Sequence, residues 1–313
     1  MLRRSMLALC MLALPLLAAR ADDKPKKLLL ITDSGGFVHD SVGFAEQLLT
    51  EMGPKRGWEV TTFRFTRDPD AKAMMDVKDE KGKVVMGPDG KPKKMERSVL
   101  EEYSERFLKI TKVPVDKAHM GHVNKETLKN FDAILFFTTG NPMTKEETKD
   151  LVEWVKAGHA YAGTHCATDT LYGVPEYGEL TGGYFDQHPW GSGTKIKVVV
   201  EDPKHPAGAP FEGNTAIQDE IYQFKTPYSR ERLHIILKLD NSSADMTLKN
   251  IHREDRDFAI SWCQEFGKGK SFYTSLGHRK EVWSDPRFQD HLFAGLDWTV
   301  GRVKGDSTPS AKT

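Results

Sequence analysis

The sequence predicts an α/β fold with a mostly parallel sheet flanked by helices and added β segments in the C-terminal half. Three observations predict it. The run 28-LLLIT-32 is short, continuous and apolar, as in a strand buried on both faces. A helical pattern and the alternating, β-branched segment 58-WEVTTFRF-65 follow it in β-α-β order. After Trp190 the chain becomes a series of strand-like segments.

Residues 1–21 have the pattern of a secretory signal peptide. Two arginines and an apolar run precede the small-x-small sequence 19-ARA-21. We therefore expect a mature chain that begins at Asp22 and is secreted or periplasmic. The apolar run is shorter than the roughly 20 residues of a membrane span, and no later segment is long and apolar enough to insert. The full chain holds 45 basic and 45 acidic residues, so composition does not point to nucleic acid as a partner.

Residues 22–301 of the mature chain are expected to form one domain. In its first half, Thr144 as N-cap and Gly158 as stop mark the clearest helix. The Lys-, Gly- and Pro-rich segment 66–97 has no apolar period and is predicted to be a surface insertion, with a hairpin turn at 88–90. The other predicted elements are a strand at 28–32, helices at 42–52 and 98–110, a short helix ending at 127–130, and strands at 58–65, 132–140 and 159–165.

The pattern of the C-terminal half of the sequence predicts strands, one helix and a polar C-terminal tail. Gly267 and Gly269 mark a hairpin between two of the strands. The polar tail, residues 302–313, is expected to be disordered. The predicted strands are 194–200, 221–224, 233–239, 258–264 and 270–276, and the helix is 286–299.

Histidines follow the predicted strands. His39 comes after the first strand, His165 and Asp169 after the strand at 159–165, and His278 after the strand at 270–276. Ligands of open α/β sheets bind at the carboxyl ends of the strands, so one shared site is expected there. Two further loops add His188 and Glu220. Such a set can bind a polyhydroxylated ligand, transfer protons near neutral pH or coordinate a divalent metal.

The stretch 163-GTHCA-167 contains two candidates for a functional residue, His165 and Cys166, and its spacing distinguishes between them. In a nucleophile elbow, the raised central residue is flanked two positions away by small residues that let strand and helix approach. Gly163 and Ala167 are the small pair, so His165 is the raised residue and not Cys166. We expect Cys166 and Cys263 to be reduced and buried, with one disulfide between them as the alternative.

A set of motifs resembles the trehalose-utilisation (ThuA-like) family. They are 37-FVHDS-41, 163-GTHCATDTLYGVPEYGELTGGYFDQHPWG-191, His205-Pro206, 219-DEIY-222 and 276-LGH-278, and together they extend the resemblance from about Lys27 to Val300. The resemblance implies a flavodoxin-like, class I glutamine amidotransferase-like fold with histidine in place of the usual elbow cysteine. It also implies a role in sugar metabolism, and members of the family are often described as glycosyl hydrolases.

The leading functional hypothesis is a carbohydrate-active hydrolase or lyase that acts on a disaccharide, glycoside or keto-sugar. Its catalytic residues are His39, His165, Asp169, His188, Glu220 and His278. One alternative is a non-catalytic sugar-binding protein in which Tyr184, Trp190 and Tyr222 contact the sugar. Another is an amidase-like hydrolase that depends on Cys166. Homo-oligomerisation stays open.

A metal is a further hypothesis for the same residues. His165, His188 and His278, with Glu220 nearby, supply the ligand types of an open catalytic zinc site. They come from separate loops without HxxxH or HxH spacing.

Overall fold

The computed structural model describes residues 24–311 of the 313-residue chain. The predicted signal peptide lies outside the described residues. Within residues 24–311, no helix has the length and apolar character needed to cross a membrane.

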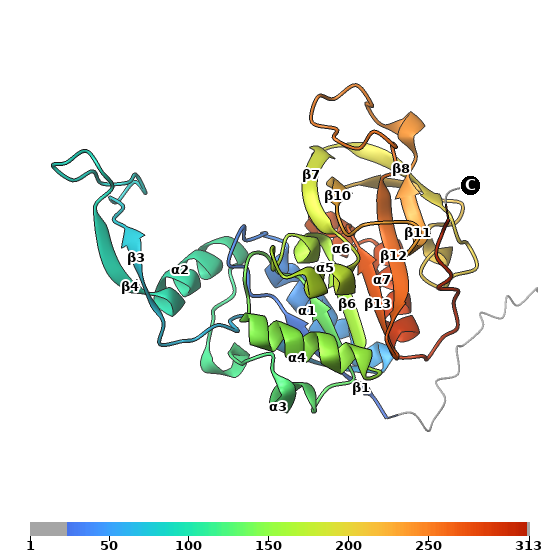
Figure 1. The fold of residues 1–313 in the computed structure, drawn as a ribbon, viewed down its shortest axis with the longest axis horizontal. Helices are drawn as coiled ribbons and strands as arrows, with labels where there is room; N and C mark the ends of the chain where they lie inside the picture. Colours follow the sequence, from blue (N-terminus) through green and yellow to red (C-terminus); the bar gives the residue numbers. More distant parts are fainter. Residues whose placement is uncertain (1–23, 312–313) are drawn as a thin grey trace, which may run out of the picture.

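A nine-stranded sheet forms the centre of the molecule (Figure 1). Five neighbouring strands are parallel. Their order places the second strand in sequence at the edge and the first strand inside it, as in flavodoxin-like folds. From the edge inward they are β2 (Trp58–Phe63), β1 (Lys26–Ile31), β5 (Ala133–Phe136), β6 (Ala160–Thr164) and β13 (Gly269–Thr274).

Antiparallel strands continue the same sheet beyond β13, so the β segments predicted in the C-terminal half extend the central sheet. These strands are β12 (Ala259–Phe266), β11 (His234–Leu239), β8 (Lys195–Val200) and β9 (Ala216–Gln218). The predicted hairpin at Gly267 joins β12 to β13. A separate antiparallel ribbon, β7 (Tyr184–Trp190) with β10 (Ile221–Lys225), lies at the upper end of the sheet in Figure 1.

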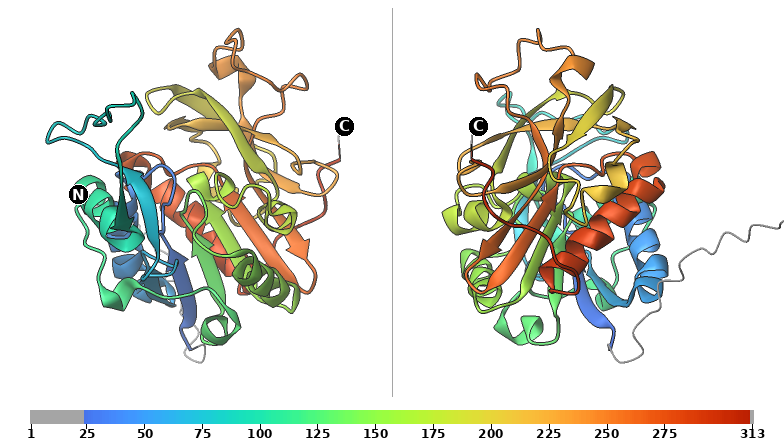
Figure 2. Two further views of the ribbon diagram at one scale, coloured as in Figure 1. Left: turned by 60° about the vertical axis from the view of Figure 1, so that its left-hand side comes forward. Right: turned by 90° about the vertical axis from the view of Figure 1, so that its right-hand side faces the viewer.

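Helices cover both faces of the parallel strands. Side chains of a strand alternate between its faces, and in β1 the pair Leu28 and Leu30 joins one buried cluster while Leu29 and Ile31 join the other. The first cluster is closed by α1 (Val42–Met52), α2 (Val99–Thr111), α6 (Lys280–Trp283) and α7 (Pro286–Thr299). The second is closed by α3 (Lys125–Leu128), α4 (Lys145–Lys156) and α5 (Pro175–Thr181). Figure 2 shows α1 and α7 on one side of the sheet and α4 on the other.

The predicted helix boundaries agree closely with the structure. The helix expected at 42–52 is α1, and the helix expected at 286–299 is α7. Thr144 caps α4 through a capping box with Glu147, which satisfies free N–H groups in the first turn. Ser98 caps α2 by accepting a hydrogen bond from the backbone N–H of Glu101.

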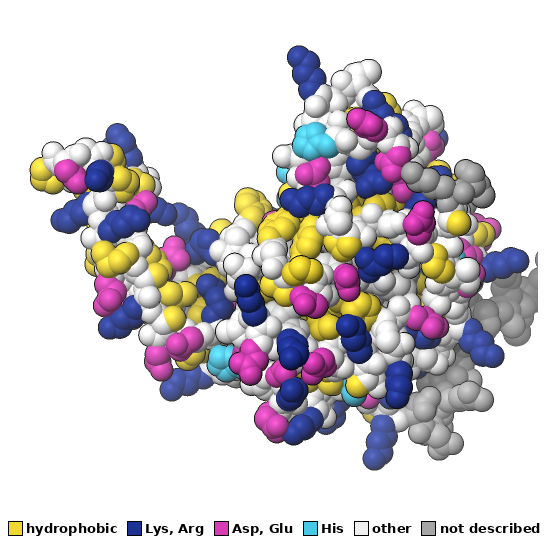
Figure 3. Space-filling view, viewed as in Figure 1, with side chains coloured by type: hydrophobic (Ala, Val, Ile, Leu, Met, Phe, Trp, Pro, Cys, Tyr) yellow, Lys and Arg dark blue, Asp and Glu magenta, His cyan; other side chains and the backbone are white. Residues whose placement is uncertain are grey.

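The predicted insertion forms an arm that projects from the body of the molecule (Figure 1). Its base is the antiparallel pair β3 (Lys72–Asp76) and β4 (Lys94–Ser98), and a turn closes at Gly87–Gly90. Methionine side chains lie exposed on it, among them Met74 and Met86. Apolar and charged side chains alternate over the arm in Figure 3, and charges of both signs are interspersed over the face of the body.

The polar tail differs from its prediction. We expected disorder over 302–313, but residues up to Ser310 pack against the sheet. Ser310 donates its backbone N–H to the carbonyl of Leu233, and its hydroxyl oxygen accepts from the backbone N–H of Ile235. His234 Nδ1 lies 2.7 Å from the carbonyl oxygen of Thr308. A polar composition hid these contacts because they are made mostly by the backbone, which every sequence carries.

Candidate functional site

Three histidines and one glutamate meet at the carboxyl ends of the parallel strands. His39 lies in the loop after β1, His165 directly after β6, and His278 in the loop after β13, while Glu220 immediately precedes β10. One potential ligand atom from each lies within 4.8 Å of the others. Nε2 of His39 is 3.2 Å from Nε2 of His165. The structure therefore brings these four predicted residues together at this edge of the sheet.

Local backbone geometry presents His165 to the site. Its φ of 47° lies in the left-handed region, which is rare for a residue with a side chain and is often associated with functional sites. Gly163 lies where an added Cβ would be 2.9 Å from Cβ of Ala167, so the strand-to-helix approach requires glycine there. The elbow is therefore centred on His165, as predicted, because the small residues Gly163 and Ala167 lie on either side of it.

Hydrogen bonds fix the imidazole of His165. Nδ1 lies 2.9 Å from the carbonyl oxygen of Ser275, so it carries the proton and leaves Nε2 with its lone pair. The hydroxyl of Tyr222 is 2.8 Å from this Nε2. Burial holds the pKa of His165 well below its usual value, and the neighbouring His39 and His278 lower it further. His165 is therefore a neutral imidazole at neutral pH.

His39 is a second neutral imidazole. Burial lowers its pKa to about 4, and His278 contributes in the same direction while Glu220 opposes. Its ring meets the ring of His165 edge to face, with centroids 4.7 Å apart. Its Nδ1 is buried and has no hydrogen-bond partner among the described residues.

His278 and Glu220 form a charged pair beside the neutral imidazoles. Nδ1 of His278 lies 3.1 Å from Oε2 of Glu220. Burial opposes both charges, but the contact outweighs it, so the pKa of His278 is raised and the pKa of Glu220 is lowered. The site therefore combines two imidazoles whose pKa values are lowered with one whose pKa is raised.

Asp219 holds the loop that carries His278. Its fully buried carboxyl accepts hydrogen bonds from the backbone N–H groups of Gly277 at 2.7 Å and Arg279 at 3.2 Å. Burial raises its pKa to about 7, although the backbone donors oppose the shift. The sequence analysis chose Glu220 from the pair 219-DE-220 and did not assign this positioning role.

Two predicted catalytic residues lie outside the group. His188 is exposed on β7, with its ring centroid 6.4 Å from that of Tyr222, and it is not among the four converging side chains. Asp169 follows the elbow and is also absent from the four converging side chains, and its carboxyl interacts with Tyr172. Of the predicted ligand set, the structure brings His165 and His278 together with Glu220 and His39, and it leaves His188 outside this group.

Two residues predicted to contact sugar are buried and hydrogen-bonded within the protein. Tyr184 is buried, and its hydroxyl donates to the carbonyl oxygens of Leu171 and Val174. Trp190 is 2% exposed, and its Nε1 donates to the carbonyl of Asp245. Of the three aromatic residues proposed to contact sugar, only Tyr222 touches the histidine group, and its ring is 3% exposed.

Cys166 is not placed to act as a nucleophile. Its side chain is 1% exposed, and burial raises its thiol pKa well above the usual value, whereas a nucleophilic cysteine needs a stabilised thiolate. Cys166 and Cys263 are both free and buried, as predicted.

A cavity of about 430 Å³ opens beside the histidine group. His39 and His278 line it, together with Phe37, whose ring is 65% exposed, and Arg106. His165 itself is fully buried behind them. The sequence analysis missed Phe37 and Arg106. The position of Phe37, two residues before His39, was a weak indication that it lies near the site. Arg106 lies on α2, and only the fold brings α2 to the loop after β1.

The parallel strand order and the polar group at the strand ends define a flavodoxin-like α/β protein with a candidate active site. The family model for ThuA, described as trehalose utilisation, matches residues 27–299, and the chain belongs to this family.

Two solved structures share this fold. A ThuA-like protein from Bacteroides uniformis has a TM-score of 0.60 at 19% sequence identity and covers 96% of this chain and 100% of that chain. Another from Parabacteroides merdae has a TM-score of 0.55 at 14% identity, with 92% and 96% covered. No curated protein matches the chain.

Proposed function

We propose that this chain is an exported carbohydrate-active enzyme, a hydrolase or lyase that acts on a glycoside, disaccharide or keto-sugar. The observation that carries the proposal is the convergence of His39, His165, Glu220 and His278 within 4.8 Å beside a cavity. General acid–base catalysis requires groups of opposite protonation state close to one substrate. The family's description as trehalose utilisation supports sugar as the substrate class.

The accessible members of the group have distinct roles in this proposal. His39, neutral and on the cavity wall, is the base that removes a proton from the substrate. His278, paired with Glu220, is the acid that protonates the leaving group or an enolate oxygen. His165 and Tyr222 are buried behind them and orient the imidazole of His39.

The carboxylates favour proton abstraction over two-carboxylate hydrolysis. Glycoside hydrolases of the common type need two carboxyl groups flanking one bond, about 5–9.5 Å apart. Here the group of Glu220 holds no second carboxylate among the described residues, and Asp40, the carboxylate that lines the cavity, forms an ion pair with Lys280. Asp186 binds His252, and Asp219 bonds to backbone N–H groups. A substrate whose carbonyl acidifies the neighbouring C–H, such as a keto-sugar, suits an imidazole base.

The test is turnover of a panel of disaccharides, simple glycosides and their 3-keto derivatives in D₂O. We expect cleavage of a keto derivative, with deuterium at the carbon next to the carbonyl, detected by NMR. His39→Ala should lower the rate by about 10²–10⁴-fold. His188→Ala, which changes an exposed histidine outside the group, is the matched control and should retain the rate. Saturable binding of these sugars without turnover would instead identify a sugar-binding protein.

Export is part of the proposal and has its own test. Expression of the full chain in a bacterial host should give a protein in the periplasm or medium whose N-terminal residue is Asp22. Intact-mass measurement distinguishes this product from the uncleaved chain. Retention of residues 1–21 in the cytoplasm would contradict export and leave the catalytic proposal unaffected.

A further inference from the structure

Three separations within the histidine group are close to those between ligands of one metal ion, and all four candidate ligand atoms lie within 4.8 Å of one another. Nε2 of His39 and Nε2 of His165 are 3.2 Å apart, and Nδ1 of His278 and Oε2 of Glu220 are 3.1 Å apart. Nε2 of His165 is 3.7 Å from the same carboxylate oxygen. A tetrahedral ion with bonds of about 2.0–2.1 Å separates its ligands by about 3.3–3.4 Å. All three distances lie within a few tenths of an ångström of that value.

Hydrogen bonding within the protein leaves the group incompletely satisfied. Because Nδ1 of His165 donates to the carbonyl of Ser275, its Nε2 has one lone pair. That lone pair faces both the hydroxyl of Tyr222 and Nε2 of His39, although it can accept only one linear hydrogen bond. Nδ1 of His39 is buried without a hydrogen-bond partner among the described residues, and Nδ1 of His278 lies 3.1 Å from Oε2 of Glu220 without the alignment of a hydrogen bond. Buried polar atoms normally have partners, so these atoms indicate a ligand.

We propose that His39, His165, His278 and Glu220 bind one divalent transition-metal ion through three imidazole nitrogens and one carboxylate oxygen. Imidazole and carboxylate ligands suit Zn²⁺ and related first-row ions. The carbonyl of Ser275 is the outer partner that fixes the tautomer of His165, a common arrangement for metal-binding histidines.

Metal binding by these residues is independent of the proposed function, and only the catalytic role of the ion rests on it. His39 and His278 line the cavity, so a substrate oxygen reaches the ion from that side. Zinc sites can expand to five ligands, and a bound ion polarises a carbonyl oxygen. With the ion bound, His39 and His278 are ligands and no longer the base and the acid. The ion then activates the substrate by acidifying the C–H beside the polarised carbonyl, and solvent water accepts the proton.

Tyr222 provides a specific consequence of this geometry. Its hydroxyl contacts the lone pair of His165 that the metal needs, so the two compete. Tyr222→Phe removes the competitor and keeps the ring. The variant should therefore bind metal at least as tightly as the unchanged chain, whereas loss of a ligand should weaken binding.

The experiment measures metal content and the cobalt spectrum of the purified chain. After removal of metal with a chelator, the chain is loaded with Zn²⁺ or Co²⁺ and freed of excess ion. We expect about one ion per chain and, with Co²⁺, the intense visible bands of a four- or five-coordinate site. His39→Ala and His278→Ala should each lower the affinity by about 10–100-fold or more. His188→Ala is the matched control and should bind as the unchanged chain does.

Two outcomes would overturn the metal site. One is an unchanged chain that retains almost no ion after loading. The other is equal metal content in His39→Ala, His278→Ala and His188→Ala. Circular dichroism identifies a variant that fails to fold, and His39→Gln and His278→Gln then replace it. Thermal stability is a second readout, because an ion that binds only the folded chain raises the midpoint of unfolding.

The same samples separate the two proposals. Metal bound at the site without turnover of any sugar would overturn the proposed function and support the metal site. Full turnover by the metal-free chain would support the proposed function and overturn the role given to the ion.

Discussion

His165 combines a strained backbone with full burial. Its left-handed φ turns the imidazole toward His39 and leaves Cys166, the next residue, inside the core. A conformation of this kind costs about 1–3 kcal/mol, which the surrounding packing must offset. The superfamily resemblance raised the question of cysteine against histidine, and the register resolved it for histidine.

The first prediction separates these neighbours. Cys166→Ala removes one buried sulfur and should retain turnover, with a stability loss of about 1 kcal/mol. His165→Ala should lower turnover by about 10²–10⁴-fold, since it removes the partner that orients His39. Kinetics on the active keto-sugar, with unfolding in urea as the stability measurement, checks both. Loss of activity in Cys166→Ala with full activity in His165→Ala would favour the cysteine mechanism.

A second residue-scale prediction concerns Phe37. Its exposed ring borders the cavity and contacts His39 edge to face, so it is available to stack on a sugar ring. Phe37→Ala should raise KM several-fold, from about 0.5–1.5 kcal/mol of lost aromatic contact, with a small change in kcat. Tyr184→Phe is the control: it should lower stability and leave KM unchanged. An unchanged KM in Phe37→Ala would remove this residue from the binding surface.

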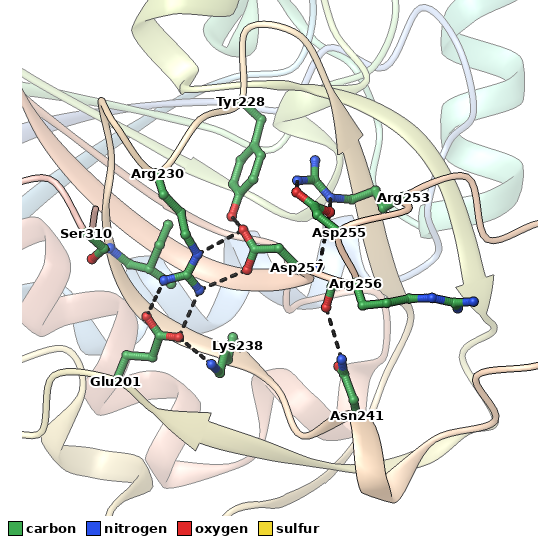
Figure 4. A network of polar contacts seen from close by, with 11 residues as sticks. Glu201, Tyr228, Arg230, Lys238, Asn241, Arg253, Asp255, Arg256, Asp257 and Ser310 are labelled. Atoms are coloured by element: carbon green, nitrogen blue, oxygen red, sulfur yellow. Dashed lines mark hydrogen bonds and ion pairs between the residues drawn. The ribbon is translucent and has the colours of Figure 1, made fainter. Parts of the chain in front are cut away.

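At the scale of elements, an ion network joins the antiparallel half of the sheet (Figure 4). Arg230 binds both oxygens of Glu201, which follows β8, and both oxygens of Asp257, which precedes β12. Lys238 on β11 also binds Glu201. A planar guanidinium can hold two carboxylates in this way, whereas an ammonium group cannot.

The third prediction therefore concerns Arg230. Arg230→Lys keeps the charge but loses the paired geometry, and we expect a loss of about 1–2 kcal/mol in the free energy of unfolding. Arg230→Ala leaves two largely buried carboxylates without their main partner and should cost about 2–4 kcal/mol. Urea unfolding measures both. Equal stability of the lysine variant and the unchanged chain would show that charge alone matters here.

At the scale of the whole molecule, the tail completes the outer side of the sheet. Trp298 donates through Nε1 to the carbonyl of Gly305, and Ser310 exchanges hydrogen bonds with the segment around β11. The tail thus connects the end of α7 to a strand on the antiparallel side.

The fourth prediction follows from these contacts. A chain that ends at Lys304 loses several hydrogen bonds of about 0.5–1.5 kcal/mol each, so its free energy of unfolding should fall by roughly 2–4 kcal/mol. A chain that ends at Ser310 keeps them and is the matched control. Thermal and urea unfolding compare the two. Equal stability would mean that the contacts of residues 305–310 add nothing in solution.

Much of the fold follows from local patterns. The apolar run at β1, the capping box of α4 and the alternation of β2 each concern residues close together in the chain, so each could be recognised without the tertiary structure. The position of His165 was equally local, because Gly163 and Ala167 set the register within five residues.

The residues that form the site could not be predicted from short segments of the sequence. His188 and Trp190 lie two residues apart on β7, so regular alternation would place both on one face of the ribbon, but the pairing register shifts between Ile221 and Gln223. In the folded chain, Trp190 packs against Phe258 and is buried, His188 is exposed, and Glu220 reaches His278. Likewise, α2 brings Arg106 to the loop of Phe37 from a distant part of the chain.

The sequence by itself therefore determined the elements, their α/β order, the family and the working register at the elbow, because these depend on neighbouring residues. Only the tertiary structure decided that His39 and not His188 joins His165, His278 and Glu220, and that the tail packs. The physical reason is that such contacts depend on how separate elements pack, and a side chain's own sequence context carries little of that information.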